Sequence, residues 1–316
     1  MKRFLMIAGS LLGVAVVATV ILFLGAAFFA AQRADYGWSP SIAAPTFTAT
    51  HPVALMDEGH CNASSIGFTG RYWPFGRLLR ADGYDVRRWT APFTGSALEG
   101  VRVLIIANAS GAPKPQLFGM NIPIQSEKKR SDPAFTPGEI ELVRSWVGRG
   151  GSLFLIADHA PFGESAAGLG AAFGVTMHRG FAEVPHELSD PLLFSAENGR
   201  LGDHPIVSGG SLPAPVHRVM TYTGQSLDGP VGAAVLLRLP HGAVEAVPEA
   251  DSLVERPAGA AQALAFEYGK GRVVVLGEAG AATAQVSGRE HYGMNSGDND
   301  NQQFVVNVMR WLAGKI

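Results

Sequence analysis

The sequence has little cysteine and little charge. One of its 316 residues is cysteine, Cys61, which excludes an internal disulfide framework and a metal site built from several thiolates. Charged residues make up 16% of the chain and the net charge is -2, so no basic excess points to nucleic acid as a partner. The P-loop, the dinucleotide-binding glycine motif and H-E-x-x-H are absent, and Gly163-Glu-Ser-Ala-Ala167 lacks the last glycine of a nucleophile elbow. These absences exclude the commonest sequence signatures of nucleotide-binding and hydrolytic enzymes.

Hydrophobic residues are abundant, at 47%, and they are most concentrated at the start of the chain. Residues 4–31 carry no charge and follow Met1-Lys-Arg3. As a helix they would extend about 42 Å at about 1.5 Å per residue, against a hydrocarbon core of about 30 Å. The apolar part of a cleaved signal peptide is shorter, about 7–15 residues. We therefore expect residues 1–31 to form an uncleaved signal-anchor, a transmembrane helix that contacts lipid through residues 4–31.

The positive charges of Lys2 and Arg3 predict the orientation of this anchor. The positive-inside rule keeps them in the cytoplasm, so we expect a single-pass protein of the inner (cytoplasmic) membrane whose main part is periplasmic or otherwise extracytoplasmic. Residues 32–50 are rich in Ala, Pro, Ser and Thr, which is typical of a linker. Residues 51–316 then form the folded domain.

The stretch from Gly150 to Gly163 organises the remainder of the chain. The apolar run Leu153–Ala157 follows a glycine pair, stops at Asp158-His159 and gives way to a Pro/Gly loop. A continuous apolar run between turn residues is typical of a strand buried on both faces of a parallel sheet. The helix before it begins at Thr136-Pro-Gly-Glu139, where Thr136 and Glu139 form a capping box and the proline suits the first helical position.

The other patterns predict an alternation of strands and helices. We expect further strands at residues 51–56, 85–89, 101–107, 216–223, 233–239, 262–268 and 272–276, and further helices at 70–82, 165–173 and 301–313. The last two strands are joined by a hairpin turn at Gly269-Lys-Gly271. Residues 109–135, which include the charged run Glu127–Arg130, form a long loop of the kind that often serves as a lid, and residues 175–215 form an irregular insertion. The result is an α/β domain with a mainly parallel sheet, helices on both faces and an antiparallel extension.

Polar side chains follow four of the predicted strands. Because ligands of open α/β sheets bind beyond the carboxyl ends of the strands, we expect these side chains to share one edge. Carboxylates and imidazoles brought together there favour general acid–base catalysis. The candidate catalytic residues are Asp57, His60, Asp158, His159 and Glu278, and the candidate substrate-binding residues are Asn62, Asn108 and Gln285.

Alternatives exist for each of these residues. Imidazole and carboxylate ligands suit a divalent metal such as zinc, for which His60, Asp158 and His159 are the candidate ligands. Capping of turns is the alternative role for strand-end carboxylates such as Glu278. Cys61 beside His60 is a candidate nucleophile, but no strand-to-turn elbow precedes it, which favours a bystander role.

Four stretches of the chain resemble the class I glutamine-amidotransferase-like superfamily, and more narrowly its membrane-anchored members of unknown function. They are the turn Asp57-Glu-Gly-His-Cys-Asn62, the run from Phe135 to His159, Gly271–Glu278, and the closing segment from Asn301 to Leu312. The resemblance implies a flavodoxin-like three-layer fold. True amidotransferases place a cysteine after a central strand and a His-x-Glu late in the chain. Here Asp158-His159 stands at the post-strand position, so the resemblance does not imply glutaminase activity.

Two functions remain open from the sequence. The first is a hydrolase, perhaps metal-assisted, that acts outside the cytoplasm with the candidate residues at its centre. The second is a non-catalytic ligand-sensing or scaffold domain at the membrane that binds a small molecule, sugar or peptide. Both depend on parallel strands that bring distant side chains together.

Overall fold

The computed structural model of the chain describes residues 31–113, 130–185, 191–212, 214–250 and 252–316, and the backbone of residues 116–117 and 120–121. The predicted anchor lies outside these ranges except for residue 31. Within the described residues, no helix has the length and apolar character needed to cross a membrane.

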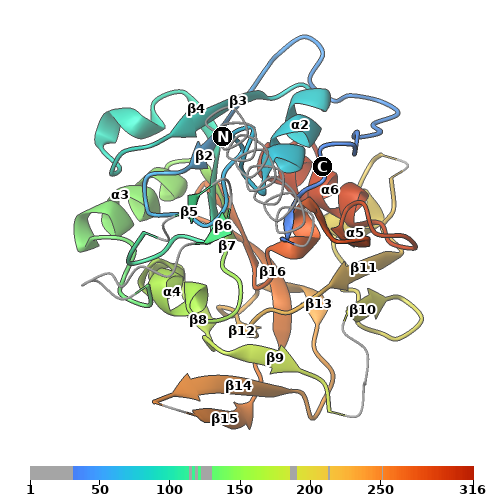
Figure 1. The fold of residues 1–316 in the computed structure, drawn as a ribbon. Coiled ribbons are helices and arrows are strands. Elements are labelled where there is room, and N and C mark those ends of the chain that lie inside the picture. The colour runs from blue at the N-terminus through green and yellow to red at the C-terminus, as the bar shows by residue number, and fades with distance from the viewer. Residues whose placement is uncertain are drawn as a thin grey trace, which may run out of the picture.

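The centre of the molecule is a nine-stranded sheet (Figure 1). Five neighbouring strands run parallel, in the order β3 (Asp85–Trp89), β2 (Val53–Asp57), β4 (Val101–Ala107), β7 (Ser152–Ile156) and β17 (Gly271–Leu276). Numbered along the chain this is the order 2-1-3-4-5 of flavodoxin-like folds. The prediction of a mainly parallel sheet is confirmed.

The antiparallel extension begins at β17. Its strands are β16 (Ala261–Tyr268), β12 (Leu227–Asp228), β8 (Thr176–Met177) and β13 (Ala234–Arg238), the last paired with β16. The predicted hairpin joins β16 to β17, with Tyr268 opposite Gly271 and Gly269 at φ +60°. Glycine adopts this left-handed conformation without steric cost.

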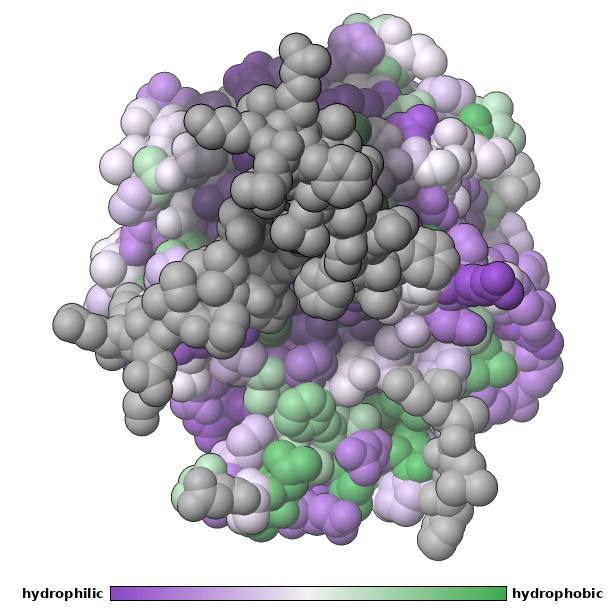
Figure 2. Space-filling view, viewed as in Figure 1, coloured by the Kyte–Doolittle hydropathy of each residue, from purple (hydrophilic) through white to green (hydrophobic). Residues whose placement is uncertain are grey.

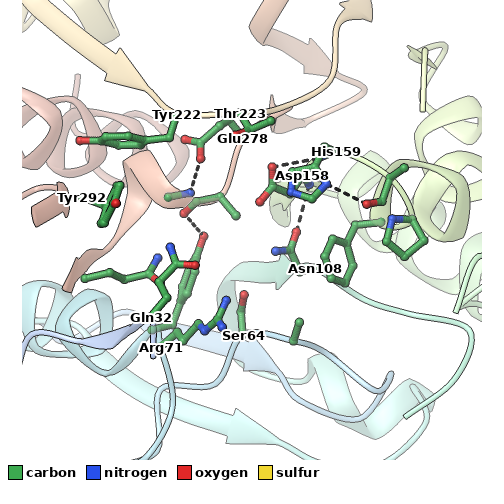
Figure 3. Close-up of a pocket in the computed structure, with 18 of the residues that line it drawn as sticks. Gln32, Ser64, Arg71, Asn108, Asp158, His159, Tyr222, Thr223, Glu278 and Tyr292 are labelled. Atoms are coloured by element: carbon green, nitrogen blue, oxygen red, sulfur yellow. Dashed lines mark hydrogen bonds between the residues drawn. The ribbon is translucent and has the colours of Figure 1, made fainter. Parts of the chain in front are cut away.

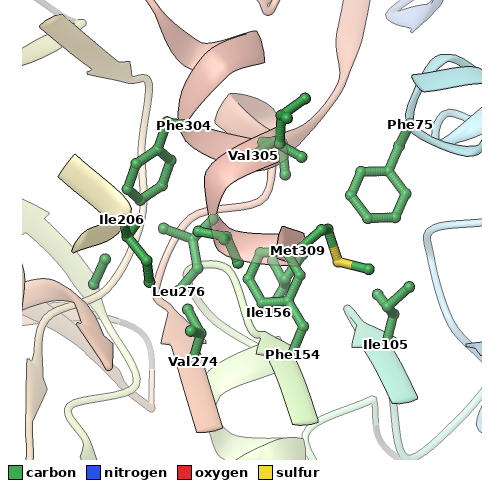
Figure 4. Close-up of a cluster of buried hydrophobic side chains, with 14 of the residues drawn as sticks. Phe75, Ile105, Phe154, Ile156, Ile206, Val274, Leu276, Phe304, Val305 and Met309 are labelled. Carbon is green, nitrogen blue, oxygen red and sulfur yellow. The ribbon is translucent and has the colours of Figure 1, made fainter. Parts of the chain in front are cut away.

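Helices cover both faces of the sheet, as the alternation along β7 shows. Phe154 and Ile156 belong to one hydrophobic core, shared with α2 (Trp73–Ala81) and α6 (Asn301–Leu312) (Figure 4). Leu153 and Leu155 belong to a second core on the opposite face, shared with α3 (Pro137–Gly148) and α4 (Phe162–Ala172). Because successive side chains of a strand point to opposite faces, a strand between two helical layers must be apolar throughout.

The start of α3 matches the predicted capping box. The Thr136 hydroxyl accepts the Glu139 amide at 3.3 Å, and a Glu139 carboxylate oxygen accepts the Thr136 amide at 2.9 Å. The next helix, α4, begins at Phe162, three residues before the predicted start, and Pro161 precedes it as the N-cap.

The region predicted as an irregular insertion contains regular structure. Its described part holds β8, β9 (Phe181–Glu183), β10 (Leu192–Ser195) and the short helix α5 (Pro205–Ser208), and β10 pairs with β11 (Arg218–Thr221) outside the central sheet. Short strands between prolines leave no periodic signal long enough to detect. In the long loop, β5 (Gln116–Leu117) and β6 (Met120–Asn121) also pair.

The hairpin of β14 (Val244–Glu249) and β15 (Ser252–Pro257) was not predicted. It pairs with β9 in a separate three-stranded sheet, and every residue of β15 is exposed, so the strand carries no buried stripe. Figure 2 shows apolar side chains gathered over this end of the molecule, where Leu253 is 59% exposed.

Residues 32–50, where we expected a linker, pack against the domain. Strand β1 (Arg33–Ala34) pairs with β18 (Ala284–Ser287), which in turn pairs with β19 (Glu290–Gly293). Phe47 is buried in the first core. Composition alone does not show that single residues of such a stretch are buried.

Candidate active site

A polar cavity of about 270 Å³ lies at the carboxyl ends of the parallel strands (Figure 3). Asn108 directly follows β4, Asp158 and His159 follow β7 after one alanine, and Glu278 follows β17 after one glycine. All four line the cavity. Three strand ends therefore bring their side chains together in the way the sequence predicts for a parallel sheet.

Asn108 positions Asp158. It adopts a left-handed conformation, with φ +49°, which asparagine tolerates better than most residues. Its side-chain oxygen accepts the Asp158 amide at 3.0 Å, and one Asp158 carboxylate oxygen accepts the His159 amide at 2.8 Å. Burial raises the pKa of Asp158, while the nearby His159 and Arg71 oppose this rise. A carboxylate with a raised pKa is a better proton acceptor than an ordinary aspartate.

The tautomer of His159 follows from its hydrogen bond. Its Nδ1 lies 2.7 Å from the carbonyl oxygen of Ala160, which can only accept, so Nδ1 carries the proton. In the neutral ring Nε2 is then a proton acceptor. The ring stacks on Phe181 with centroids 4.7 Å apart, and the loop continues through a cis peptide bond at Ala160–Pro161. Stacking and the carbonyl together fix the ring in the cavity wall.

Gln225 holds the loop that follows β7 in place. Its side-chain amide donates to the carbonyl oxygens of Ala157 and Asp158, at 2.8 and 3.2 Å, and its side-chain oxygen accepts the Arg179 amide at 3.0 Å. Gln225 is fully buried. It was not among the predicted site residues, because nothing in its local sequence distinguishes it.

Glu278 lines the cavity but its oxygens bind backbone. One accepts the Gly280 amide and the other the Ala281 amide, both at 2.6 Å, at the start of the 3-10 turn η2 (Gly280–Ala282). This is the capping role that we gave as the alternative. Gln285, from β18, also lines the cavity, and its Oε1 is buried with no hydrogen-bond partner in the described part of the chain.

Asp57, His60 and Asn62 form a different cluster. His60 Nδ1 lies 2.8 Å from Asp57 Oδ1, and His60 Nε2 lies 2.9 Å from Oε1 of Glu139, which the sequence did not suggest. Asn62 donates to the other Asp57 oxygen at 3.1 Å. None of these four lines the cavity. Of the eight predicted site residues, Asn108, Asp158, His159, Glu278 and Gln285 come together, and Asp57, His60 and Asn62 lie apart.

Opposite charges dominate the second cluster. Burial by itself lowers the pKa of His60, but the hydrogen bonds and charges of Asp57 and Glu139 raise it overall. Burial raises the pKa of Glu139, yet hydrogen bonds from His60, Thr136 and the Phe93 amide lower it to about 2. The raised pKa favours the protonated form of the imidazole, which lies between two carboxylates and outside the cavity.

The predicted metal ligands do not converge. Asp158 and His159 line the cavity, whereas both ring nitrogens of His60 bind carboxylates in the other cluster. Across the described ranges, no three His, Cys, Asp or Glu side chains are grouped so as to hold a metal ion. The structure therefore does not bring together His60, Asp158 and His159, the candidate ligands of the alternative divalent-metal site.

Several cavity residues were missed at the sequence level. They come from segments with no periodic pattern or from strands whose ends we did not place at this edge: Gln32, Ser64, Arg71, Arg130, Tyr222 and Tyr292. Tyr222 directly follows β11, but β11 lies outside the central sheet and the predicted strand 216–223 includes this residue, so the strand-end rule that found Asp158 does not apply to it. Arg130 lies in the long loop for which we suggested a lid.

Comparison with known proteins supports the fold. No family model and no curated protein matches the sequence. The mmIFT52 N-terminal domain is similar in structure, with a TM-score of 0.52 and 15% identity over 82% of this chain and 97% of that one. Similar structures also include a ThuA-like protein from Bacteroides uniformis (TM-score 0.45, 13% identity, 87% of this chain and 94% of that one) and a GMP synthase protein from Thermoplasma acidophilum (TM-score 0.41, 11% identity, 84% and 95%). By its strand order the chain is a three-layer α/β protein with flavodoxin-like topology, and at 15% identity the likeness to the mmIFT52 domain concerns the fold alone.

Proposed function

We propose that the chain is a membrane-anchored hydrolase of the glutamine-amidotransferase-like superfamily that acts on a small polar molecule outside the cytoplasm. The observation that carries the proposal is the pair Asp158 and His159, adjacent at the end of β7 and both in the wall of one cavity. Asp158 has a raised pKa and His159 presents Nε2 as its variable proton site. Groups of this kind at a strand edge are the raw material of acid–base catalysis.

We assign the two residues complementary protonation states, with Asp158 ionised and His159 protonated. The ionised Asp158 accepts a proton from a water molecule as the water oxygen attacks the electrophilic carbon of the substrate. Protonated His159 gives its Nε2 proton to the leaving atom. One water molecule is consumed, because its hydroxyl bonds to the electrophilic carbon and the leaving atom receives a proton. Arg71 lies close enough to lower the pKa of Asp158, and it thereby stabilises the ionised form.

Thiol chemistry forms no part of this proposal. Cys61 is exposed and does not line the cavity, and the position after the central strand β7 carries Asp158. A glutaminase of this superfamily would need a cysteine there. In this proposal the nucleophile is water and not a thiolate.

The membrane anchor belongs to the proposal because it rests on the sequence of residues 4–31. The described part of the chain adds one supporting fact: Gln32, the residue after the predicted anchor, lines the cavity. A protein anchored by residues 4–31, with its N-terminus inside, would hold this cavity close to the outer surface of the membrane.

A non-catalytic ligand-sensing or scaffold domain is the second candidate. The observation in its favour is the capping role of Glu278. Because its two carboxylate oxygens cap η2, Asp158 is the carboxylate that remains next to His159. A binding domain would use the same cavity without turnover.

The test is turnover by the full chain. We would assay p-nitrophenyl esters, p-nitrophenyl glycosides and chromogenic peptides with the native protein, with Asp158→Asn, and with Asp203→Asn, an exposed aspartate outside the cavity, as the control. We expect turnover of one class, a loss of about 100-fold or more in Asp158→Asn, and no change in the control. Absence of turnover in every class would overturn the hydrolase in favour of the binding domain, and full activity of Asp158→Asn would overturn the catalytic role of Asp158.

A further inference from the structure

We infer that the cavity binds the oxyanion of its ligand, a carboxylate or phosphate group, through the guanidinium of Arg130. The inference rests on the proposed function only in that it concerns the same cavity, and it names the substrate class. Arg130 lines the cavity together with Asp158 and His159.

The backbone of Arg130 is fixed. Its carbonyl oxygen accepts hydrogen bonds from the Gly111 amide at 3.0 Å, from the Ser110 hydroxyl at 3.2 Å and from the Ser165 hydroxyl. Its guanidinium lies over the ring of Phe162, 4.9 Å from the centroid. The three hydrogen bonds fix the backbone of Arg130 and the aromatic face orients its guanidinium, so the cation is placed before any ligand binds.

The polar edge of this guanidinium has no protein partner. Nε and Nη2 of Arg130 are both buried, and neither forms a hydrogen bond with the residues that the structure describes. In Arg144 and Arg310, the same two nitrogens bind the two oxygens of one carboxylate, at Glu141 and Asp82. Nε and Nη2 form the planar fork that matches an oxyanion. In Arg130 the fork is unpaired toward the described residues, and we expect an oxyanion to complete it as the carboxylates do for Arg144 and Arg310.

The charges around Arg130 also favour an anionic ligand. No described carboxylate forms an ion pair with Arg130, and burial lowers its pKa with no acidic neighbour to oppose the change. A buried cation without a counter-charge is costly, so an anion that fills the fork removes that cost. The first turn of α4 adds positive potential beside it, because this helix begins at Phe162 without a capping side chain.

The rest of the cavity limits the size and charge of the ligand. About 270 Å³ lies just below the ~300–1,000 Å³ range of small-ligand pockets. Asp158 disfavours a second anionic group near it, while Asn108, Tyr222 and Tyr292 offer polar contacts in the wall. The ligand is thus a small molecule with one oxyanion and polar substituents.

The test is anion-dependent thermal unfolding of the full chain. Acetate and inorganic phosphate are the probes, each compared with chloride at equal ionic strength. The variants are Arg130→Gln, Arg130→Lys, which keeps charge without the fork, and the exposed Arg149→Gln as the matched control. We expect the native protein and the control to melt several degrees higher in at least one probe, Arg130→Lys to lose more than half of that shift, and Arg130→Gln to lose all of it. The better probe distinguishes a carboxylate from a phosphate ligand.

Two results would overturn the inference: no shift of the native protein with either anion, or an equal shift in Arg130→Gln. Folding of the variants is checked by the melting temperature in chloride, which we expect to be kept or raised because a buried unpaired charge is removed. Asp158→Asn separates the two proposals, since it should lose turnover but keep the anion shift. A melting temperature raised by an anion, without turnover of any substrate, would support the anion site and overturn the hydrolase. Turnover without an anion-dependent change in melting temperature would support the hydrolase and overturn the anion site.

Discussion

His60 Nε2 lies 2.9 Å from Oε1 of Glu139, a residue 79 positions further along the chain. Asp57 binds the other ring nitrogen at 2.8 Å, and the rings of Phe93 and Phe135 pack on the imidazole with centroids 4.7 and 4.5 Å away. The contact ties the loop after β2 to the first turn of α3. It makes the stability of the fold depend on two protonation states.

This contact predicts a maximum of stability in weakly acidic solution. The pKa of His60 is raised above 6.5 in the folded state, so its contribution is complete below that value and disappears as the pH rises through the folded pKa. The pKa of Glu139 falls from 4.5 to about 2, so its contribution is complete above 4.5 and disappears as the pH falls toward 2. The free energy of unfolding, measured by urea titration at a series of pH values, should be largest between these limits.

Glu139→Gln should lower the unfolding free energy by about 3 kcal/mol within that window, because it leaves His60 with one carboxylate and weakens a buried pair. It should also flatten the pH dependence. Glu141→Gln, in the same helix but exposed, is the control and should change little. Equal pH profiles for the native protein and Glu139→Gln would contradict the assignment of His60 as a protonated, doubly bound imidazole.

A second buried ion pair joins the end of α2 to α6. Arg310 donates from Nε and Nη2 to both oxygens of Asp82, at 3.0 and 2.6 Å, and both side chains are almost fully buried. Asp82 also accepts the Thr46 amide at 2.8 Å. Arg310→Met leaves the Asp82 carboxylate uncompensated, so we expect a loss of about 3–5 kcal/mol in chemical unfolding.

The exposed pair of Arg87 with Asp85 supplies the comparison for Arg310. Arg87→Met should cost about 1 kcal/mol or less, because solvent screens this contact. If Arg310→Met cost no more than Arg87→Met, the Asp82–Arg310 pair would not be a major tie between the two helices.

Cys61 should be dispensable. It is exposed, adopts φ +51° in the turn after β2 and does not line the cavity. Iodoacetamide should therefore modify it, and neither this modification nor Cys61→Ser should change the turnover of the substrate found in the hydrolase assay. Loss of that activity on alkylation of the native protein, but not of Cys61→Ser, would show that the thiol lies near the reaction after all.

The sequence predicted the central layer well because its signals are local. Leu153–Ala157 is apolar throughout because both faces of β7 are covered, and Thr136 with Glu139 caps α3 within one turn. The hairpin β14–β15 gave no such signal, since β15 buries none of its residues.

The candidate site was predicted only in part. The end of a strand indicates at which edge of the sheet a residue lies, but not toward which face of the sheet its side chain turns. Asp158 and His159 enter the cavity directly after β7. His60 instead turns toward the α3 side, where Phe93 and Phe135 belong to the second core. Its amide bonds to the Asn62 side chain at 3.0 Å, a local turn that the residue types alone do not specify.

Arg130 was missed for a different reason. It closes a charged run in a loop without a period, and such runs are usually solvated. The burial of its side-chain nitrogens can be recognised only in the folded structure, where Ser110, Gly111 and Ser165 bind its backbone carbonyl oxygen.

The titration of Asp158 tests the central claim most directly, because the proposed chemistry needs its raised pKa. We would follow the side-chain carboxyl carbons of 13C-labelled aspartate by NMR in the full chain and assign Asp158 by its absence in Asp158→Asn. The account predicts a pKa above 3.8 and a further rise in Arg71→Met, because Arg71 lowers it in the native protein. Titration of Asp158 at an ordinary value, unmoved by Arg71→Met, would contradict it.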